Sequence, residues 1–250
     1  METKKSIIEY EDRVVCFLDI LGFSEHVLQT ISDDQSIIVQ KIGEIEGALE
    51  AVRDVLDLDE EKCQGSTQIT QFSDCIVISF LSNEQSGVFF TLESILWVLI
   101  ELVKRGFIFR GGIVRGQLAH DNRLLFGPAM IDAYELEKKA AYYPRVVLDK
   151  SIVSLSGDYS APHHNGSDEI AYVNELAVKD FDGMYYIDYF GAAQKELDDP
   201  ECDYPLYLEN LYKLIEKGLE NKDASIRIKY QWMKEKYLAV MEQNKAELVK

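Results

Sequence analysis

Positive charge is scarce in this sequence. Its 250 residues include 26 Lys and Arg against 44 Asp and Glu, which gives a formal net charge of −18. Nucleic acids and anionic membrane surfaces both bind proteins largely through clustered basic side chains. We therefore expect no nucleic acid and no membrane among the partners of this protein. The hydrophobic content of 47% is enough to bury a sizeable core.

Paired cysteines, an apolar leader and an uncharged segment of membrane length are also missing. The one long apolar stretch, residues 88–109, contains four charged side chains that a bilayer core disfavours, and it is typical of a buried helix running into a strand. The first 13 residues contain no apolar signal segment, which predicts a cytoplasmic protein. Because no C-x-x-C pair is present, we expect reduced, buried thiols rather than zinc or disulfides. The four cysteines are Cys16, Cys63, Cys75 and Cys202.

Apolar periodicity predicts alternating strands and helices over the first 200 residues. Strands are expected at residues 14–21, 67–72, 75–80, 107–114, 145–148, 170–174 and 185–190, with a further hairpin at 117–126. Helices are expected at 24–58, restarting near 32–34, and at 83–105 and 127–142, with a loop at 157–169. Two charged amphipathic helices follow at 204–219 and 224–249. We therefore predict a domain of residues 1–200 and a helical appendage of residues 201–250.

Two acidic residues stand next to short connections between predicted strands. Asp19 lies in VVCFLDILGF, and Asp74 lies in QFSDCIVISF, between the strands of a hairpin. If the first strand lies beside this hairpin, both carboxylates converge on one end of the sheet, where two hard oxygen ligands suit Mg²⁺ or Mn²⁺ carrying a phosphate substrate. Either acid alone is as readily explained as a sheet-end residue bonded to a turn. The adjacent turn at residues 22–24, whose N–H groups can face phosphates, favours the metal site.

Four segments, in order, resemble the motifs of class III nucleotidyl cyclases. They are FLDILGFS at 17–24, QFSDC at 71–75, RGGIVRG at 110–116 and FGPAMIDAYELE at 126–137. The resemblance extends over residues 14–190. It implies an α+β fold, a ferredoxin-like βαββαβ palm-type cyclase domain with an antiparallel-rich sheet, followed here by the C-terminal helical appendage. It also implies two Mn²⁺ or Mg²⁺ ions and a homodimer with active sites at the interface.

The resemblance also assigns roles to individual residues. It implies that Asp19, Ile20 and Asp74 hold the metal ions, and that both aspartates are catalytic. The implied nucleotide-binding residues are Ile20, Gly22, Phe23, Ser24 and Thr70.

Cations are needed as well, because a triphosphate adds about four negative charges to an acidic protein. The candidates are Arg110 and Arg115 as catalytic residues, Lys179 as a nucleotide-binding residue, and Arg145. Pairing with the surplus of Asp and Glu is the alternative explanation for each of them.

Departures from the purine cyclase pattern indicate a different base. Thr70 stands where those enzymes place a long base-reading Lys or Glu, and Leu124 replaces a second base-reading acid. Ile131 and Glu135 replace the Asn that orients the ribose and the Arg that stabilises the transition state. These losses fit either an inactive homologue or another substrate. Two retained carboxylates repel each other unless a cation is bound, which argues against inactivity.

Together with YPRVV at 143–147, the pattern resembles the bacterial pyrimidine cyclases of Pycsar antiphage systems. That resemblance implies conversion of UTP, ahead of CTP, to cyclic UMP or cyclic CMP, and a separate effector protein that senses the product. Two alternatives stay open: a non-catalytic dimer that binds nucleotide and signals through the appendage, and a purine cyclase.

Overall fold

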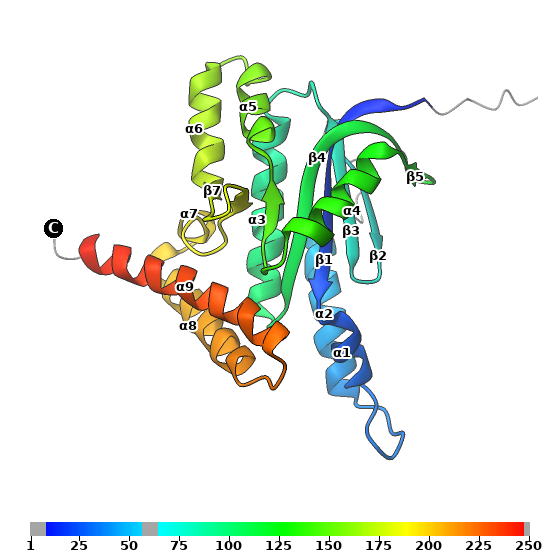
Figure 1. Ribbon diagram of the computed structural model, residues 1–250, viewed down its shortest axis with the longest axis vertical. Helices are drawn as coiled ribbons and strands as arrows, with labels where there is room; N and C mark the ends of the chain where they lie inside the picture. The colour runs from blue at the N-terminus through cyan, green and yellow to red at the C-terminus, as the bar shows by residue number, and fades with distance from the viewer. Residues whose placement is uncertain (1–8, 57–64, 248–250) are drawn as a thin grey trace, which may run out of the picture.

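The computed structural model describes residues 9–56 and 65–247 and shows a mixed α+β architecture built on one eight-stranded sheet (Figure 1). The strands are β1 (Glu11–Leu21), β2 (Gln68–Phe72), β3 (Cys75–Leu81), β4 (Ile108–His120), β5 (Leu125–Phe126), β6 (Val146–Leu148), β7 (Ala177–Lys179) and β8 (Tyr185–Ile187). The helices are α1 (Phe23–Leu28), α2 (Val39–Val55), α3 (Gly87–Lys104), α4 (Pro128–Ala140), α5 (Lys150–Asp158), α6 (Gly166–Leu176), α7 (Ala193–Glu196), α8 (Pro200–Leu219) and α9 (Ala224–Glu247).

The first four strands have the ferredoxin-like arrangement that the sequence predicts. In space their order is β2-β3-β1-β4, and every neighbouring pair is antiparallel. Helices lie between β1 and β2 and between β3 and β4, which completes the βαββαβ unit. The remaining strands extend the sheet beyond β4 in the order β6-β8-β7, and β5 pairs with the far end of β4.

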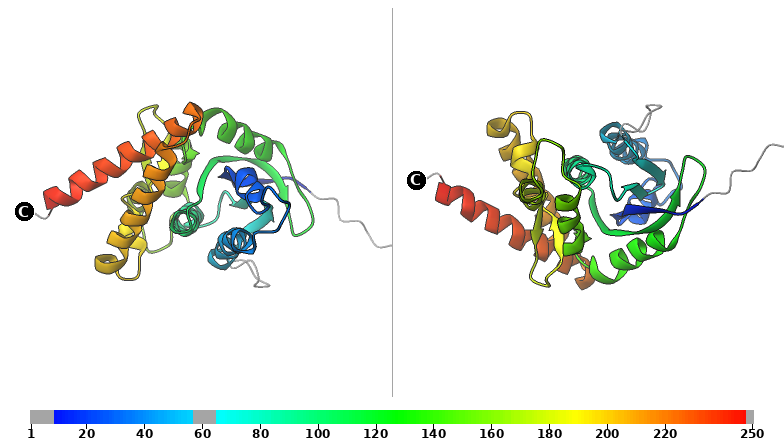
Figure 2. Two further views of the ribbon diagram at one scale, coloured as in Figure 1. Left: turned by 90° about the horizontal axis from the view of Figure 1, so that it is seen from below. Right: turned by 90° about the horizontal axis from the view of Figure 1, so that it is seen from above.

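The alternation of side chains along β1 divides the core into two layers. Cys16 and Leu18 face the main core, which includes buried side chains of α2 and α3. Val15 and Phe17 point to the other face and pack in a smaller cluster with α4. Figure 2 shows α4 on one side of the sheet and α2 and α3 on the other. The smaller cluster marks the face on which the candidate site lies.

Two adjacent glycines of β4 allow close approach of the neighbouring backbone. A Cβ on Gly111 would lie 2.5 Å from the carbonyl oxygen of Phe17 in β1. A Cβ on Gly112 would lie 2.7 Å from the carbonyl oxygen of Ala133 in α4, and 3.0 Å from the backbone nitrogen of Glu137. Since real Cβ atoms do not tolerate such short distances, Gly112 lets α4 pack directly on β4, and Gly111 lets β4 lie close to the backbone of β1.

The region of residues 157–176 differs from its prediction. The strand expected at 170–174 is wrong, because these residues belong to α6, and the expected loop contains the ends of α5 and α6. The buried residues Glu169, Val173 and Leu176 recur at helical spacing. Asn165 caps the helix by accepting hydrogen bonds from the N–H groups of residues 167 and 168. A cap and a buried stripe thus outweigh the strand propensity of IAYVN.

Two boundaries also moved. The helix expected to restart near residues 32–34 begins instead at Val39, because the Asp34 carboxylate accepts hydrogen bonds from Ser32 and Ser36 and closes a local turn. The strand at 107–114 and the first arm of the hairpin at 117–126 form one continuous strand, β4. The hairpin turn itself is as predicted, with Asp121 accepting hydrogen bonds from the following backbone N–H groups.

The C-terminal helical part predicted from the sequence is present as an antiparallel pair, α8 and α9, that packs beside the sheet (Figure 1). Buried side chains from both helices, including Leu211 and Met233, belong to the same hydrophobic core as β1 and α3. The indole of Trp232 and the ammonium of Lys236 on α9 donate to Asp180, at 3.0 and 2.6 Å. A division of the chain at residue 200 remains a prediction.

The thiols differ in exposure. Cys16 is buried as expected, Cys75 is half-buried, and Cys202 is exposed, which contradicts the expectation of a buried thiol there. The exposed position follows from the first turn of α8, which is oriented toward solvent. Cys63 lies outside the described residues.

Among the residues that the structure describes, no helix has both the length and the apolar character needed to span a bilayer.

Candidate functional site

The two aspartates singled out from the sequence lie together at one end of the sheet. In the strand register, Asp19 on β1 stands between Cys75 on β3 and Arg110 on β4. Asp74 occupies the two-residue turn between β2 and β3, preceded by Ser73 in the left-handed conformation at φ 56°. The N–H of Ile20 donates to the carbonyl oxygen of Asp74 at 3.2 Å and ties the two acidic segments together. The predicted convergence of the carboxylates is confirmed.

Asp19, Asp74 and Cys75 form a group whose ligand atoms lie within 4.8 Å of one another. Carboxylate oxygens are the ligands that Mg²⁺ and Mn²⁺ prefer, whereas a thiolate prefers softer metals. Burial, together with the charges of Asp19 and Asp74, raises the pKa of Cys75 to about 11, so its thiol stays protonated. The thiol donates to Asp19 Oδ1 at 3.8 Å. The donor set therefore fits a hard divalent cation held by two carboxylates.

A third carboxylate, Glu137 on α4, lies next to this pair. Arg110 donates from Nε to Asp19 Oδ2 at 3.2 Å and also contacts Oε1 of Glu137 outside hydrogen-bond geometry. The Glu137 side chain is 2% exposed and that of Asp19 is 20% exposed. Asp19 and Glu137 thus share one guanidinium, and Asp74 lies beside Asp19.

This crowding raises the pKa values of two acids. Burial raises the pKa of Asp19, Arg110 opposes that rise, and the charge of Asp74 adds to it. Burial likewise raises the pKa of Glu137, again opposed by Arg110 and increased by Asp19. Deprotonation of these acids is therefore less favourable than in water, and a bound cation would relieve the repulsion.

Lys229 on α9 brings a further positive charge to this region. Burial lowers the pKa of Lys229, the charge of Arg110 lowers it further, and Asp19 raises it. Neither Lys229 nor Glu137 received a role from sequence reasoning. Glu137 ends the segment at 126–137, so its motif was visible, whereas a charged helical face in the appendage gave no signal for Lys229.

The turn after β1 has the conformation that the sequence suggests. Gly22 adopts φ 74°, a left-handed conformation that favours glycine, and it directly precedes α1. Phe23 is buried, Ser24 is exposed, and the N–H groups of Glu25 and His26 donate to the carbonyl of Gly22. Phosphate binding by this turn stays a prediction.

Thr70, the predicted base-reading residue, lies half-buried on β2 on the same face of the sheet as Asp19. Its hydroxyl lies 2.9 Å from Nε2 of His120, at the far end of β4. Nδ1 of His120 lies 2.8 Å from the hydroxyl of Ser79, to which Arg13 donates from Nε at 2.9 Å. The partners in this chain come from three different strands and from the start of β1, so no local sequence pattern signals it.

Three predicted cations lie away from the aspartates within the protomer. Arg115 pairs with Asp12 near the opposite end of β1, with a shortest distance of 2.7 Å. Arg145 is fully buried between Asp180 and Asp182, so the alternative of pairing with acids describes it correctly.

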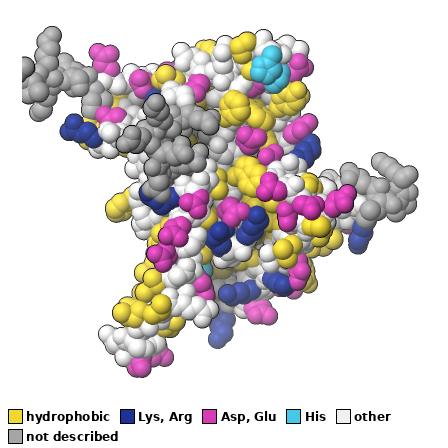
Figure 3. All heavy atoms as spheres, turned by 180° about the vertical axis from the view of Figure 1, so that it is seen from behind, with side chains coloured by type: hydrophobic (Ala, Val, Ile, Leu, Met, Phe, Trp, Pro, Cys, Tyr) yellow, Lys and Arg dark blue, Asp and Glu magenta, His cyan; other side chains and the backbone are white. Residues whose placement is uncertain are grey.

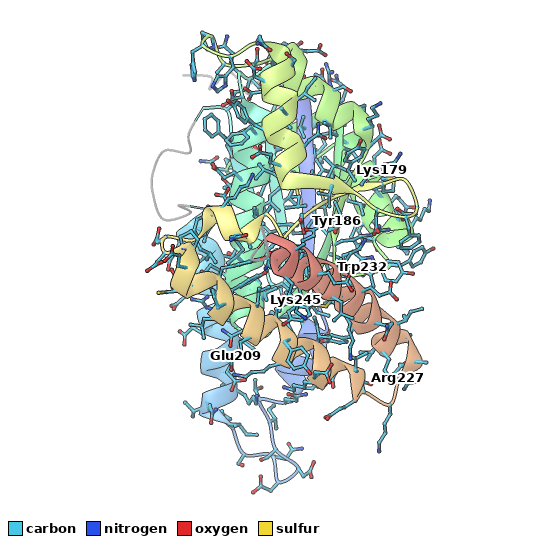
Figure 4. All side chains as sticks on the ribbon, turned by 90° about the vertical axis from the view of Figure 1, so that its left-hand side faces the viewer. Lys179, Tyr186, Glu209, Arg227, Trp232 and Lys245 are labelled. Atoms are coloured by element: carbon cyan, nitrogen blue, oxygen red, sulfur yellow. The ribbon has the colours of Figure 1, made fainter. Side chains whose placement is uncertain are left out.

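Lys179 lies on β7, the edge strand four positions from β1, which places it roughly 19 Å from β1 across the sheet. Figure 4 shows Lys179 on the same side of the molecule as Tyr186 and Trp232. Neither Lys179 nor Arg115 is carried into the site proposed below.

Charged side chains are intermixed over much of the surface. On the face seen in Figure 3, dark blue basic side chains lie among magenta acidic ones, with hydrophobic side chains between them. Hydrophobic side chains also gather at the protruding tip between α1 and α2, where Leu28, Ile37 and Val39 are exposed.

No protein-family model and no curated protein matches this sequence. Among solved structures, a bacterial light-regulated adenylyl cyclase is similar at 12% identity and a TM-score of 0.45, over 82% of this chain and 99% of that one. A class III adenylyl cyclase-like ATP-binding protein from Pseudomonas aeruginosa gives 13% identity and a TM-score of 0.44, over 84% of this chain and 47% of that one. The catalytic core of a rhodopsin-guanylyl cyclase with converted specificity, in complex with ATPαS, gives 13% identity and a TM-score of 0.40, over 72% of this chain and 96% of that one.

Proposed function

We propose that this chain is a class III nucleotidyl cyclase that converts UTP, ahead of CTP, to the 3′,5′-cyclic monophosphate and pyrophosphate. The observation that carries the proposal is the pair of carboxylates of Asp19 and Asp74, which lie together at one end of the sheet beside the Gly22 turn. These residues belong to the two segments that resemble the metal motifs of such cyclases. Their excess negative charge gives a physical reason for a bound cation.

Asp19 and Asp74 would hold Mg²⁺ or Mn²⁺, with Ile20 as the further ligand that the resemblance implies. Such ions, when bound, make the ribose 3′-hydroxyl a stronger nucleophile and neutralise the leaving pyrophosphate. In the reaction the 3′ oxygen forms a bond to the α-phosphorus, its proton leaves, and the bond from that phosphorus to the pyrophosphate oxygen breaks.

Two groups of the chain would position the phosphates in this proposal. Arg110 is held by Asp19 and Glu137, so its guanidinium stays at the mouth of the site. The N–H groups of Phe23 and Ser24 begin a helix and have no preceding helical carbonyl to pair with. We assign the triphosphate to these donors.

The base assignment depends on Thr70. Its short hydroxyl stands where purine cyclases place a long charged side chain, and Leu124, at the second such position, is an exposed apolar residue. A site that hydrogen-bonds its substrate rejects analogues lacking the partner group by roughly 10⁴-fold. We therefore expect strong discrimination against ATP and GTP.

We also propose a homodimer with active sites at its interface and a product sensed by a separate effector in antiphage defence. Large apolar side chains on the face that carries the site are exposed in the single chain. They are Phe72 on β2 and Ile131 and Tyr134 on α4. Such a cluster is typical of a protein interface.

The cyclase activity is tested by incubating the purified protein with each of the four ribonucleoside triphosphates and Mn²⁺ and resolving the products by mass. We expect cyclic UMP, less cyclic CMP, and no product from an Asp19→Asn control. Cyclic AMP or cyclic GMP at equal rates would identify a purine or unselective cyclase. Nucleotide binding without any cyclic product would identify a non-catalytic module.

The dimer is tested with Ile131→Asp, which places a charge on the exposed face of α4. We expect light scattering after gel filtration to show a monomer, and the product assay with UTP to show no activity. Ile228→Asp is the matched control, because Ile228 is similarly exposed but lies on α9. A dimer that survives Ile131→Asp would place the interface elsewhere.

A further inference from the structure

The hydrogen-bond chain behind Thr70 determines which way its hydroxyl can donate. Arg13, Ser79 and His120 are 3%, 0% and 7% exposed, so water does not supply their partners. The chain runs from Arg13 Nε to Ser79 Oγ, from Ser79 Oγ to His120 Nδ1, and from His120 Nε2 to Thr70 Oγ1. Thr70 is its only member with partial solvent exposure.

The direction of each hydrogen bond follows from the first donor. A guanidinium nitrogen of Arg13 can only donate, so the Ser79 oxygen accepts from it. Among the described residues, His120 Nδ1 is the remaining partner of that hydroxyl, and the hydroxyl proton is satisfied only by donating to it. A buried hydroxyl proton without an acceptor is costly. Nδ1 of His120 is therefore the acceptor nitrogen.

The charge state of His120 agrees with this direction. Burial and the nearby charge of Arg13 lower the pKa of His120 to about 4, against the opposing charge of Asp121. The ring is thus neutral near pH 7, with its single proton on Nε2. That proton is donated to the Thr70 oxygen, and the Thr70 hydroxyl proton is left for a ligand.

We propose that His120 is a positioning residue that makes Thr70 a hydrogen-bond donor toward the base, and that this donor selects uracil through its O4 atom. The inference rests on the proposed function, in which Thr70 reads a pyrimidine. Uracil presents an acceptor at position 4, whereas cytosine presents the donor N4 amino group there. A donating hydroxyl therefore pairs with uracil and faces a second donor in cytosine. The structure thereby supplies a physical reason for UTP over CTP.

The tautomer is tested directly, without any activity, by ¹⁵N NMR of the imidazole nitrogens of His120 at pH 7 in the full chain, assigned by comparison with His120→Gln. We expect an unprotonated Nδ1 and a protonated Nε2. A proton on Nδ1 would overturn the proposal, because Nε2 would then accept from Thr70 and reverse its hydroxyl.

Selectivity is tested as the ratio of kcat/KM for UTP to that for CTP. In wild type we expect UTP to be preferred roughly 10-fold to 100-fold, the effect of one unmatched hydrogen bond. His120→Gln places an amide N–H near the position of Nε2 and should retain the preference. His120→Glu places an acceptor there, so Thr70 must donate to it and the preference should fall or reverse toward CTP.

Matched variants keep the test conclusive if a buried glutamate prevents folding. Thr70→Val removes the hydroxyl at constant shape and should bring the ratio near one, whereas Thr70→Ser should keep the preference. Ser79→Ala should lower the ratio, while Ser82→Ala, a buried serine bonded to Asp12 outside this chain, should not. The inference is overturned if no folded variant of His120, Ser79 or Thr70 changes the ratio of kcat/KM for UTP to that for CTP. It is also overturned if the wild type prefers CTP.

Failure of the proposed function has a different signature. If the wild-type protein neither cyclises nor binds UTP or CTP, the proposed pyrimidine cyclase activity is refuted, whichever His120 tautomer NMR reports. If UTP and CTP are turned over equally well, the proposed cyclase activity stands, and only the proposed role of His120 is refuted.

Discussion

Two clusters of charged side chains in this protein use the same residue types with opposite results. In the buried cluster, the carboxylates of Asp180 and Asp182 face the cations of Arg145 and Lys236. The charges balance, and the side chains of Arg145 and Asp180 are 1% and 0% exposed. In addition, the indole N–H of Trp232 satisfies Asp180.

The site cluster has an excess of carboxylates, because Asp19 and Glu137 both contact the guanidinium of Arg110 and Asp74 lies beside Asp19. Lys229 adds a further cation to this region. The cluster is partly open, since the Asp19 and Arg110 side chains are 20% and 29% exposed. A balanced, closed network holds elements together. An unbalanced, open one is suited to binding a cation, and this difference leads to four predictions.

The largest effect is expected at the unbalanced cluster. Asp19→Asn or Asp74→Asn removes a hard ligand, and turnover should fall by at least about 1,000-fold, because metal-assisted charge stabilisation contributes several kcal/mol. The fold should persist, since each change also removes a repelling charge. Product formation is measured by mass and stability by thermal melting. A variant with near wild-type turnover in Mn²⁺ would refute the metal site.

At the balanced cluster the expected loss is in stability. Arg145→Met removes the guanidinium from the buried carboxylate of Asp180 and from the partly exposed carboxylate of Asp182, and should cost about 3–5 kcal/mol of unfolding free energy. The control is Arg115→Met, which breaks an exposed pair with Asp12 and should cost less than about 1 kcal/mol. Urea unfolding measures both. Equal losses would mean that burial does not distinguish the two pairs.

The pH dependence of stability should have opposite signs at the two clusters. Burial raises the pKa of Asp19, so the folded state holds that proton more tightly, and stability falls as the pH rises from the unfolded pKa through the folded one. The pKa of Asp182 is lowered by Arg145 and the N–H of Met184, against burial, so its contribution is lost as the pH falls through the folded pKa.

These signs are separated by urea unfolding of wild type, Asp19→Asn and Asp182→Asn between about pH 3 and pH 7. Asp19→Asn should reduce the loss of stability toward neutral pH. Asp182→Asn should reduce the loss toward acid. If both substitutions change the unfolding free energy on the same side of the pH profile, the two clusters do not differ in the sign of their pH dependence.

The smallest effect is expected at Cys75. Its protonated thiol makes a weak 3.8 Å hydrogen bond to Asp19 and is unsuited to a hard cation. Cys75→Ala should therefore keep Mn²⁺-dependent turnover within about threefold, consistent with the loss of less than about 1 kcal/mol. A loss as large as that of Asp19→Asn would make the thiol a metal ligand.

Local patterns in the sequence determined much of what surrounds the site. Residues 14–21 form a buried strand that ends at Gly22, and the two-residue connection before Cys75 forms a hairpin turn, because alternation and turn chemistry act over a few residues. The placement of Asp19 and Asp74 followed from these elements. Where a local preference competed with packing, as in α6, packing and the Asn165 cap decided the structure.

Only the tertiary structure decided the partners of these residues. Arg110 meets Asp19 across 91 positions of sequence, and Thr70 meets His120 across 50. Such pairs depend on the antiparallel register and on the curvature that carries the end of β4 back over β2 and β3, and no pattern within one segment encodes either. Tertiary packing also pairs Arg145 with two acids, Asp180 and Asp182, although the sequence alone presented it as a cation like Arg110.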